Sequence, residues 1–176
     1  MSKRIASLVA LSLALSLAAW AHTVGVVLVE EDLPVLALAD SALASEALST
    51  GALDALFDAG QIAVGSPVLR APRAAWIDPA FALKDAREGW VDFLVLLFVS
   101  YRQGEPRETP AIPGTLSWRL VRVADGAVLE SGSVAGPPDS PDLVAKLADS
   151  SRALGAVAAK GCIAKLDPFR TPGGKP

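Results

Sequence analysis

The side chains that most often carry out catalysis or bind metals are scarce in this sequence of 176 residues. His22 is the only histidine and Cys162 the only cysteine. Serine and cysteine nucleophiles usually depend on a histidine base, and a copper site built on His22 at a processed amino terminus would need a second histidine. The sequence also lacks a Gly-rich phosphate-binding loop. We therefore expect no catalytic, metal-binding or cofactor-binding residues and no enzyme activity.

Cys162 follows Lys160 and Gly161 at the end of an expected helix. A single cysteine cannot form an internal disulfide, so the fold must be stabilised by its core. The thiol is either exposed and able to form an intermolecular bond, or a small buried hydrophobic group. The second interpretation is favoured because free cysteines are usually buried.

Charged residues follow three apolar runs of the sequence. They are Glu30, Glu31 and Asp32 after the first run, Arg70 and Arg73 after the second, and Arg102 after the third. If these runs are parallel strands, their carboxyl ends meet at the edge where open α/β sheets usually bind ligands. This set is a candidate polar recognition patch; the alternative is a group of solvated strand ends with weak ion pairs. Neighbouring residues on a strand point in alternate directions, so the acidic trio is a poor acid/base site.

A long polar segment, Arg102–Gly114, contains three prolines and charges of both signs. Long loops inside compact domains are often functional, and prolines reduce the cost of ordering a loop on a partner. We expect this loop, with nearby aromatic side chains as exposed anchors, to contact a partner protein. The candidate residues are Trp76, Tyr101, Arg102, Glu105, Arg107 and Glu108.

The first 21 residues have the pattern of a secretory signal peptide. Met1–Arg4 is basic, Ile5–Ala18 is apolar, and Ala19 and Ala21 place small residues at the two positions that signal peptidase inspects. We expect cleavage after Ala21 and a periplasmic or secreted product. A retained amino-terminal membrane anchor is the alternative, because the apolar stretch is nearly long enough to span a bilayer.

The remaining sequence suits one globular domain, 22–163, followed by a flexible tail, 164–176. Hydrophobic residues make up 52% of the whole chain, enough for a substantial core. Without the first 21 residues the chain has 14 basic and 19 acidic residues, a net charge of about −5. This charge disfavours nucleic acids and anionic membrane surfaces as partners.

The run Trp90–Tyr101, WVDFLVLLFVSY, is the most apolar part of that domain. It is too short for a membrane-spanning helix, and its Val, Phe and Leu content is typical of a strand buried on both faces. We expect it at the centre of a sheet, with Trp90 and Trp118 packed in the core or on the sheet face.

Turn and cap signals divide the chain into β-α-β-α-β-β-β-α, an α/β (α+β) fold with a mixed sheet of about five strands. We expect the helices on one face of the sheet, without a third layer, and the first three strands parallel. The expected strands are 23–29, 62–69, 90–101, 115–123 and 127–134, and the expected helices run from Asp40-Ser41 to Gly60, from Asp78-Pro79 to Gly89, and from Ser140-Pro141 to Gly161. Pro67 favours an edge position for the second strand, and Asp125-Gly126 predicts a hairpin.

Within the first helix, Leu43, Ala47, Leu53, Leu56 and Phe57 mark the expected apolar face, and Ser49–Gly51 could interrupt it. In the last helix the apolar face is marked by Leu143, Leu147, Leu154 and Val157, and a loose tail is expected from Leu166 onward.

Three segments resemble the exported domain of the CsgG/LpoB type, whose fold is similar to that of the amino-terminal domain of TolB. They are LDALFDAG (Leu53–Gly60), Trp90–Tyr101 and LSWRLVRVADGAVLESG (Leu116–Gly132). The matching positions are Phe57, Gly60, Asp92, Arg119, Leu120, Val121, Val123, Gly126, Val128 and Leu129. This group includes penicillin-binding-protein activators and curli secretion lipoproteins, so the resemblance implies accessory work in the cell envelope through protein contacts. The sequence lacks the group's lipid-bearing cysteine and long membrane-inserting segments, so neither a lipid tether nor a channel is expected.

We therefore interpret the sequence as an exported, non-catalytic protein-interaction or scaffold domain of the bacterial envelope, with an envelope protein as partner. A periplasmic small-molecule binding module that uses the charged strand ends is the first alternative. An enzyme of unknown type, perhaps carboxylate-dependent, is the second.

Overall fold

The computed structural model describes residues 21–32, 41–73, 76, 80–102, 110–138 and 140–166, without the side chain of Phe81. Three sets of predictions fall outside this part: residues 1–20 of the predicted signal peptide, Glu105, Arg107 and Glu108 of the loop, and the predicted tail from 167 onward. None of the helices in the described ranges is long and apolar enough to cross a bilayer.

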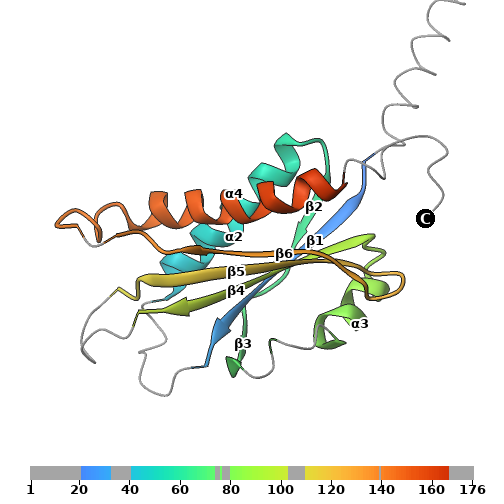
Figure 1. The fold of residues 1–176 in the computed structure, drawn as a ribbon, viewed down its shortest axis with the longest axis horizontal. Helices are drawn as coiled ribbons and strands as arrows, with labels where there is room; N and C mark the ends of the chain where they lie inside the picture. Colours follow the sequence, from blue (N-terminus) through green and yellow to red (C-terminus); the bar gives the residue numbers. More distant parts are fainter. Residues whose placement is uncertain are drawn as a thin grey trace, which may run out of the picture.

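Two apolar strands, β1 (Thr23–Glu31) and β4 (Phe93–Tyr101), form the centre of a mixed sheet (Figure 1). The strand order is β2-β1-β4-β5-β6, and β3 also pairs with β1. The remaining strands are β2 (Ile62–Gly65), β3 (Leu69–Ala71), β5 (Pro113–Arg122) and β6 (Val128–Ala135). The predicted α/β class and the mixed sheet are confirmed.

Strand β4 is where the topology changes. It pairs parallel with β1 and antiparallel with β5, and its side chains are buried on both faces. A strand flanked on both sides and covered on both faces needs apolar residues at nearly every position. The predicted central strand is confirmed.

The predicted strand 62–69 is two strands rather than one. β2 pairs with the first half of β1 and β3 with the second half, both parallel. Pro67 lies between them and has no backbone N–H to donate to β1. The edge position that Pro67 predicts is confirmed.

Helices cover both faces of the sheet, which corrects the expectation of one face. α2 (Ala42–Asp58) and α4 (Leu147–Leu166) pack on the face of Val26, Leu28 and Val95, whereas α3 (Ala80–Glu88) packs on the face of Leu94 and Leu96 (Figure 1). Both faces of β1 and β4 are apolar, so each needs a cover. The sheet is therefore the middle of three layers.

Helix α2 is continuous through Ser49–Gly51, where an interruption had been expected. Its buried face is Ala44, Ser45, Leu48, Gly51, Ala52, Ala55 and Leu56, while Leu43 and Phe57 are exposed. A Cβ at Gly51 would overlap the Arg152 carbonyl of α4, and a Cβ at Gly155 would overlap the Leu48 carbonyl of α2. The two glycines let the helix backbones approach closely, so small residues, rather than large apolar ones, mark the interface.

Helix α4 begins at Leu147 and ends at Leu166, later at both ends than expected. Leu166 is fully buried and belongs to the core, so it is not part of a loose tail as expected. The rest of the predicted tail lies outside the described residues. Val157 is exposed, contrary to its predicted place on the apolar face.

The hairpin between β5 and β6 forms as predicted. Gly126 has a φ of 75°, a conformation that glycine adopts without strain. Arg122 and Asp125 form an ion pair at 2.7 Å beside it.

Candidate functional site

The carboxylate of Glu30 lies inside the protein, at the end of β1. Side chains alternate along a strand, so Glu30 shares the face of Val26 and Leu28, beneath α2. Only 3% of this residue is exposed. A buried carboxylate needs several hydrogen bonds or a cation to replace its hydration.

Three groups donate hydrogen bonds to the Glu30 oxygens. The hydroxyl of Ser45 on α2 donates to Oε1 and also contacts the Tyr101 hydroxyl, and Tyr101 at the end of β4 donates to the same Oε1 at 3.1 Å. Arg70 of β3 donates from Nε to Oε2 at 3.1 Å. The cluster therefore ties β1, β3, β4 and α2 together at the carboxyl ends of the parallel strands.

The hydroxyl of Tyr101 is one of the two buried donors to Glu30. Burial raises the pKa of its hydroxyl well above the ordinary value, the Ser45 hydrogen bond partly opposes this rise, and the Glu30 charge adds to it. Tyr101 therefore stays protonated at physiological pH and continues to donate to the carboxylate.

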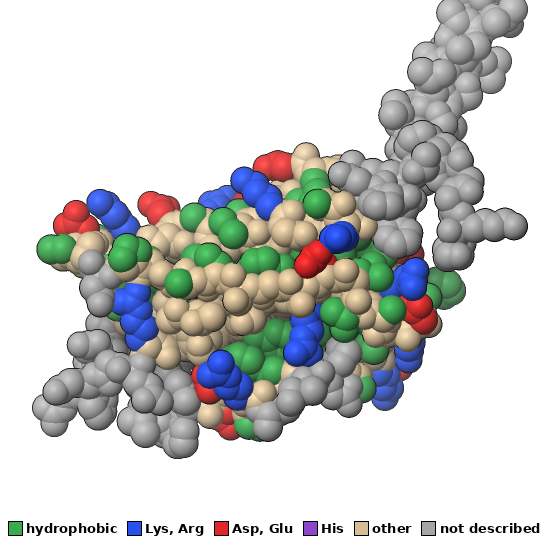
Figure 2. Space-filling model, in the orientation of Figure 1, with side chains coloured by type: hydrophobic (Ala, Val, Ile, Leu, Met, Phe, Trp, Pro, Cys, Tyr) green, Lys and Arg blue, Asp and Glu red, His purple; other side chains and the backbone are tan. Residues whose placement is uncertain are grey.

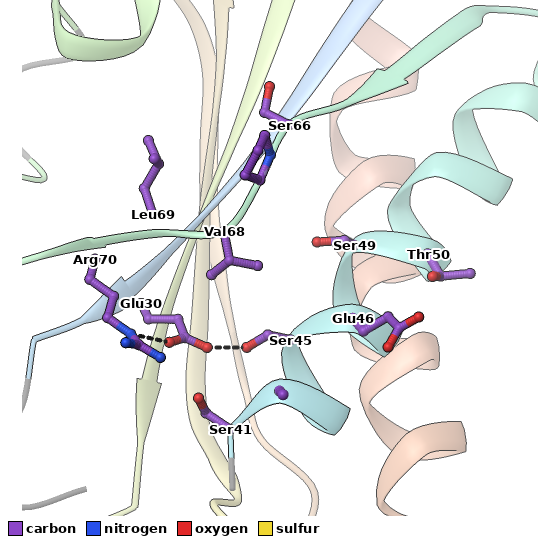
Figure 3. Close-up of a pocket in the computed structure, with 12 residues that line it drawn as sticks. Glu30, Ser41, Ser45, Glu46, Ser49, Thr50, Ser66, Val68, Leu69 and Arg70 are labelled. Atoms are coloured by element: carbon purple, nitrogen blue, oxygen red, sulfur yellow. Dashed lines mark hydrogen bonds and ion pairs between the residues drawn. The ribbon is translucent and has the colours of Figure 1, made fainter. Parts of the chain in front are cut away.

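A groove of about 720 Å³ runs above this cluster, between α2 and the segment that joins β2 to β3 (Figure 3). Its lining residues are Glu30, Ser41, Ala42, Ser45, Glu46, Ser49, Thr50, Ser66, Pro67, Val68, Leu69 and Arg70. In Figure 3, Ser45 and Arg70 reach Glu30 from opposite walls. The groove has the size of a small-molecule site, and many of its polar groups are hydroxyls.

The groove has little capacity for acid/base or nucleophilic chemistry. Ser45 is 1% exposed and already bonded to Glu30, so its oxygen is out of reach of a substrate. Glu30 accepts hydrogen bonds on both oxygens, so neither oxygen is available to take a proton from a substrate. The cluster acts mainly as a structural anchor for α2 on the sheet.

The predicted polar patch divides between the two faces of the sheet. Glu30 and Arg70 meet on the α2 side, as expected for parallel strand ends. Arg73 instead lies over the Trp76 ring on the α3 side. Asp32 is exposed and Glu31 half-buried, so the acidic trio does not converge.

Two of the expected exposed anchors are buried. Trp76 stacks on Phe98 with ring centroids 5.1 Å apart, and Tyr101 belongs to the Glu30 cluster. Trp118 is half-buried, with its ring over Gly132 and Gly161. Arg102 is half-buried where β4 ends, and its backbone N–H donates to Ile112 at 2.9 Å. A partner-binding role for Arg102, Glu105, Arg107 and Glu108 stays a prediction.

The other candidate chemical groups are part of the framework. The backbone N–H of His22 donates to Gln61, and its ring packs edge-on against Phe93. Cys162 is fully buried, and burial raises the pKa of its thiol to about 12. Within the described ranges, no three acidic, histidine or cysteine residues gather as metal ligands would.

An exposed apolar surface along the sheet edge was missed by the sequence interpretation. Ile62, Val64 and Leu69 are 53%, 47% and 39% exposed. They point to the α3 side, because Ala63 and Gly65 face α2 and Leu69 neighbours Ala71, which packs on the α3 side. We call these three side chains the edge patch. The alternation of Ile62 and Val64 with the smaller Ala63 and Gly65 was the available signal.

Trp90 is the most exposed large apolar side chain among the described residues, at 89%, although packing in the core or on the sheet face had been expected. Its φ of 56° is in the left-handed region, which is uncommon for residues other than glycine. Next to it, Val91 packs over Gly25, and Gly25 pairs with Val64 of the edge patch. Trp90 therefore lies near the amino-terminal end of the edge patch.

No protein-family model matches the chain, and no curated protein matches it. Solved structures with a similar course of the chain include the PelC dodecamer from Paraburkholderia phytofirmans, 21% identical, which covers 83% of this chain and 87% of that chain with a TM-score of 0.47. A lipoprotein from Neisseria meningitidis is 16% identical, with 73% and 94% coverage and a TM-score of 0.37. The LpoB C-terminal domain from Escherichia coli is 16% identical, with 67% and 83% coverage and a TM-score of 0.34. An LpoB domain thus stands among the similar structures, but at these values the likeness assigns no family and carries no functional argument.

Proposed function

We propose that this chain is an exported, non-catalytic protein-interaction domain of the bacterial envelope. The edge patch is the observation that carries the proposal. Edge strands leave backbone N–H and C=O groups unpaired, and soluble proteins usually protect such edges with charges or a covering element. Here the edge strand β2 instead carries Ile62 and Val64, both about half exposed.

The short helix α3 explains why this edge is open. Its nine residues contribute Ala82, Leu83 and Ala86 to the packing against the sheet. Leu83 lies near Gly126, at the β5–β6 hairpin, on the side of the sheet opposite β2. The edge patch is therefore left for another protein to cover, and apolar side chains at an open edge favour such an interface.

The proposal is tested with the full-length chain in its source cells. Ile62→Thr and Val64→Thr together keep β-branched residues in the strand but replace an ethyl group and a methyl group, respectively, by hydroxyls. We expect the double variant to fold, because both side chains are exposed, and to lose at least about tenfold of the co-purifying partner. Val157→Thr, at an exposed position on α4, is the matched control. Equal partner recovery from the double variant and the control would refute the proposal.

A deletion inside the proline loop tests its predicted contribution to partner binding, and it should spare residues 111–113. Ala111 and Pro113 are buried, and Ile112 accepts the Arg102 N–H. Removing residues 105–109 leaves these contacts in place. Unchanged partner recovery after this deletion would eliminate the loop from the interface without affecting the edge patch.

Small-molecule binding in the groove above Glu30 is the second candidate function. Its volume of about 720 Å³ favours it, since ligand pockets usually measure roughly 300–1,000 Å³. It ranks second because two of the three charged groups that line the groove, Glu30 and Arg70, are already bonded to each other. Ligand-observed NMR with neutral polyols and amino acids would test it, with Ser49→Leu as the blocking variant. Signals that are identical for wild type and Ser49→Leu would eliminate the groove.

A further inference from the structure

We propose that an extended apolar segment of the partner protein binds along the open side of β2 and adds one strand to the sheet. The inference rests on the proposed protein-interaction function and names the form and chemistry of the bound segment. β2 comes first in the strand order β2-β1-β4-β5-β6, so no strand of the described residues pairs with its outer side. Strand addition at such an edge combines main-chain hydrogen bonds with contacts from alternate side chains.

The hydrogen bonds to β1 fix which backbone groups of β2 face the open side. The Ile62 N–H donates to the carbonyl of His22, just before β1, at 2.9 Å. Successive residues of a strand direct their N–H and C=O groups to opposite sides, and β1 lies on only one side of β2. The N–H and C=O groups of Ala63 and Gly65 therefore face away from β1. Each of these two residues offers a donor and an acceptor to an added strand.

Apolar side chains flank this open edge on both faces of the sheet. On the α3 side they are Ile62 and Val64 of the edge patch. On the α2 side, a Cβ at Gly65 would lie 3.1 Å from a Leu53 methyl carbon, so the missing side chain leaves Leu53 beside the edge. Phe57 follows Leu53 by one turn on the same side of α2 and is 72% exposed. An added strand would therefore meet apolar side chains on both of its faces.

The opposite edge strand, β6, has the composition of a protected edge. It carries Ser131 and Ser133, both exposed, and its Glu130 pairs with Lys165 of α4 at 3.4 Å. Figure 2 shows this edge as a band of small side chains and backbone beneath α4. Charged residues on an edge strand disfavour pairing with another chain, and the sequence of β2, IAVG, contains none. Of the two edges, β2 is therefore the one that suits an added apolar strand.

The open edge suits a short uncharged segment with apolar side chains at alternate positions. β2 has four residues, which span about 13 Å at roughly 3.3 Å per residue, so a segment of about five residues covers it. A second copy of this chain is a poorer occupant, because the net charge of −3 opposes self-association. We therefore assign the segment to a different protein.

The test is fluorescence anisotropy of the labelled peptide Val-Thr-Val-Thr-Val with the purified chain. We expect saturable binding that is at least about tenfold weaker for the same peptide methylated at every amide nitrogen, which has no backbone donors. This comparison tests backbone pairing without any change to the chain, so it does not depend on the folding of a variant.

Two proline variants locate the binding edge. Ala63→Pro removes an outward-facing N–H and no bond to β1, so it should fold and should weaken binding by at least about tenfold. Ser133→Pro is the matched control on β6. Gly136 donates to Gly114 of β5, so the N–H of Ser133, three residues earlier, faces away from β5. Ser133→Pro should change the affinity by less than about twofold.

Absence of saturable binding, equal binding of the two peptides, or equal losses in Ala63→Pro and Ser133→Pro would overturn strand addition. A dimer of the chain in analytical ultracentrifugation that Ala63→Pro abolishes would overturn the foreign segment in favour of a second copy. The two proposals can fail separately. If cells retain the partner on Ala63→Pro but lose it from the Ile62→Thr and Val64→Thr double variant, the interface stands and the added strand is refuted.

Discussion

The Tyr101 hydroxyl donates a hydrogen bond of 3.1 Å to the Glu30 carboxylate, although the two residues are 71 positions apart in the sequence. They end the two central strands, β4 and β1, which pair parallel. Glu30 and Tyr101 thereby close the carboxyl end of the sheet core beneath α2. The polar cluster at this point fixes the floor of the groove.

Tyr101→Phe should destabilise the fold. The substitution keeps the ring but removes a donor to Glu30 and a partner of Ser45, leaving buried polar groups less satisfied. We expect the free energy of unfolding to fall by about 1–3 kcal/mol in urea denaturation. Arg152→Gln is the control, because its ion pair with Asp54 is exposed on both sides and lies outside the cluster. A loss for Tyr101→Phe no larger than that for Arg152→Gln would contradict the structural role of the cluster.

Gly155→Ala should also destabilise the fold, because the new methyl group would overlap the Leu48 carbonyl of α2. The expected loss is about 1–3 kcal/mol, despite the higher helix propensity of alanine. Gly161→Ala in the same helix meets only the Trp118 side chain, which can shift more easily than backbone. The midpoint temperature of thermal unfolding should be clearly lower for Gly155→Ala than for Gly161→Ala. The reverse order would refute the close α2–α4 contact.

Cys162 should be unreactive in the folded protein. With a thiol pKa of about 12, raised first by burial and then by Glu130, the thiolate is a minor form at pH 8. We expect a thiol reagent such as DTNB to react slowly in buffer and rapidly in urea. The unfolded thiol ionises near pH 8.5, so this group's contribution to stability is present below that pH and is lost as pH rises toward about 12. Fast native-state reaction would show that the thiol is exposed.

Asp125 should titrate below the ordinary range of aspartates. Its pKa is lowered first by the Arg122 hydrogen bonds and then by the Ala127 N–H. A lowered folded pKa means that the carboxylate's contribution to stability is present above the unfolded pKa and is lost as pH falls through the folded value. NMR titration of the Asp125 carboxyl should show this shift, and Arg122→Gln should reduce it. An unchanged titration in Arg122→Gln would contradict the ion pair.

The parts of the fold that could be predicted from the sequence are those specified locally. Trp90–Tyr101 contains the uniformly apolar strand β4, and Asp125-Gly126 gives the hairpin, because strand burial and turn geometry depend on neighbouring residues. The buried face of α2 was predicted wrongly for a different reason. Its contact with α4 is made by Gly51, Ala52 and Ala55, and small residues at a close helix crossing leave no large apolar stripe to detect.

The candidate site was harder to predict because it depends on long-range contacts. Glu30 resembles a solvated strand end, like Glu31 and Asp32 beside it. Only its alternation with Val26 and Leu28 indicates an inward side chain. Its partners Ser45 and Tyr101 come from other elements, and a single sequence contains no signal that pairs them. Trp90 was expected in the core or on the sheet face, but it lies in the turn that follows α3 and is exposed.

Photo-crosslinking from position 62 in the source cells tests the protein-interaction account most directly. A benzoylphenylalanine that replaces Ile62 projects outward from the edge patch. One that replaces Val157 on α4 is the control at a position of similar exposure. The account predicts one dominant protein adduct from position 62, absent from position 157 and competed by excess purified wild-type chain. No adduct from position 62, or the same adducts from both positions, would contradict it.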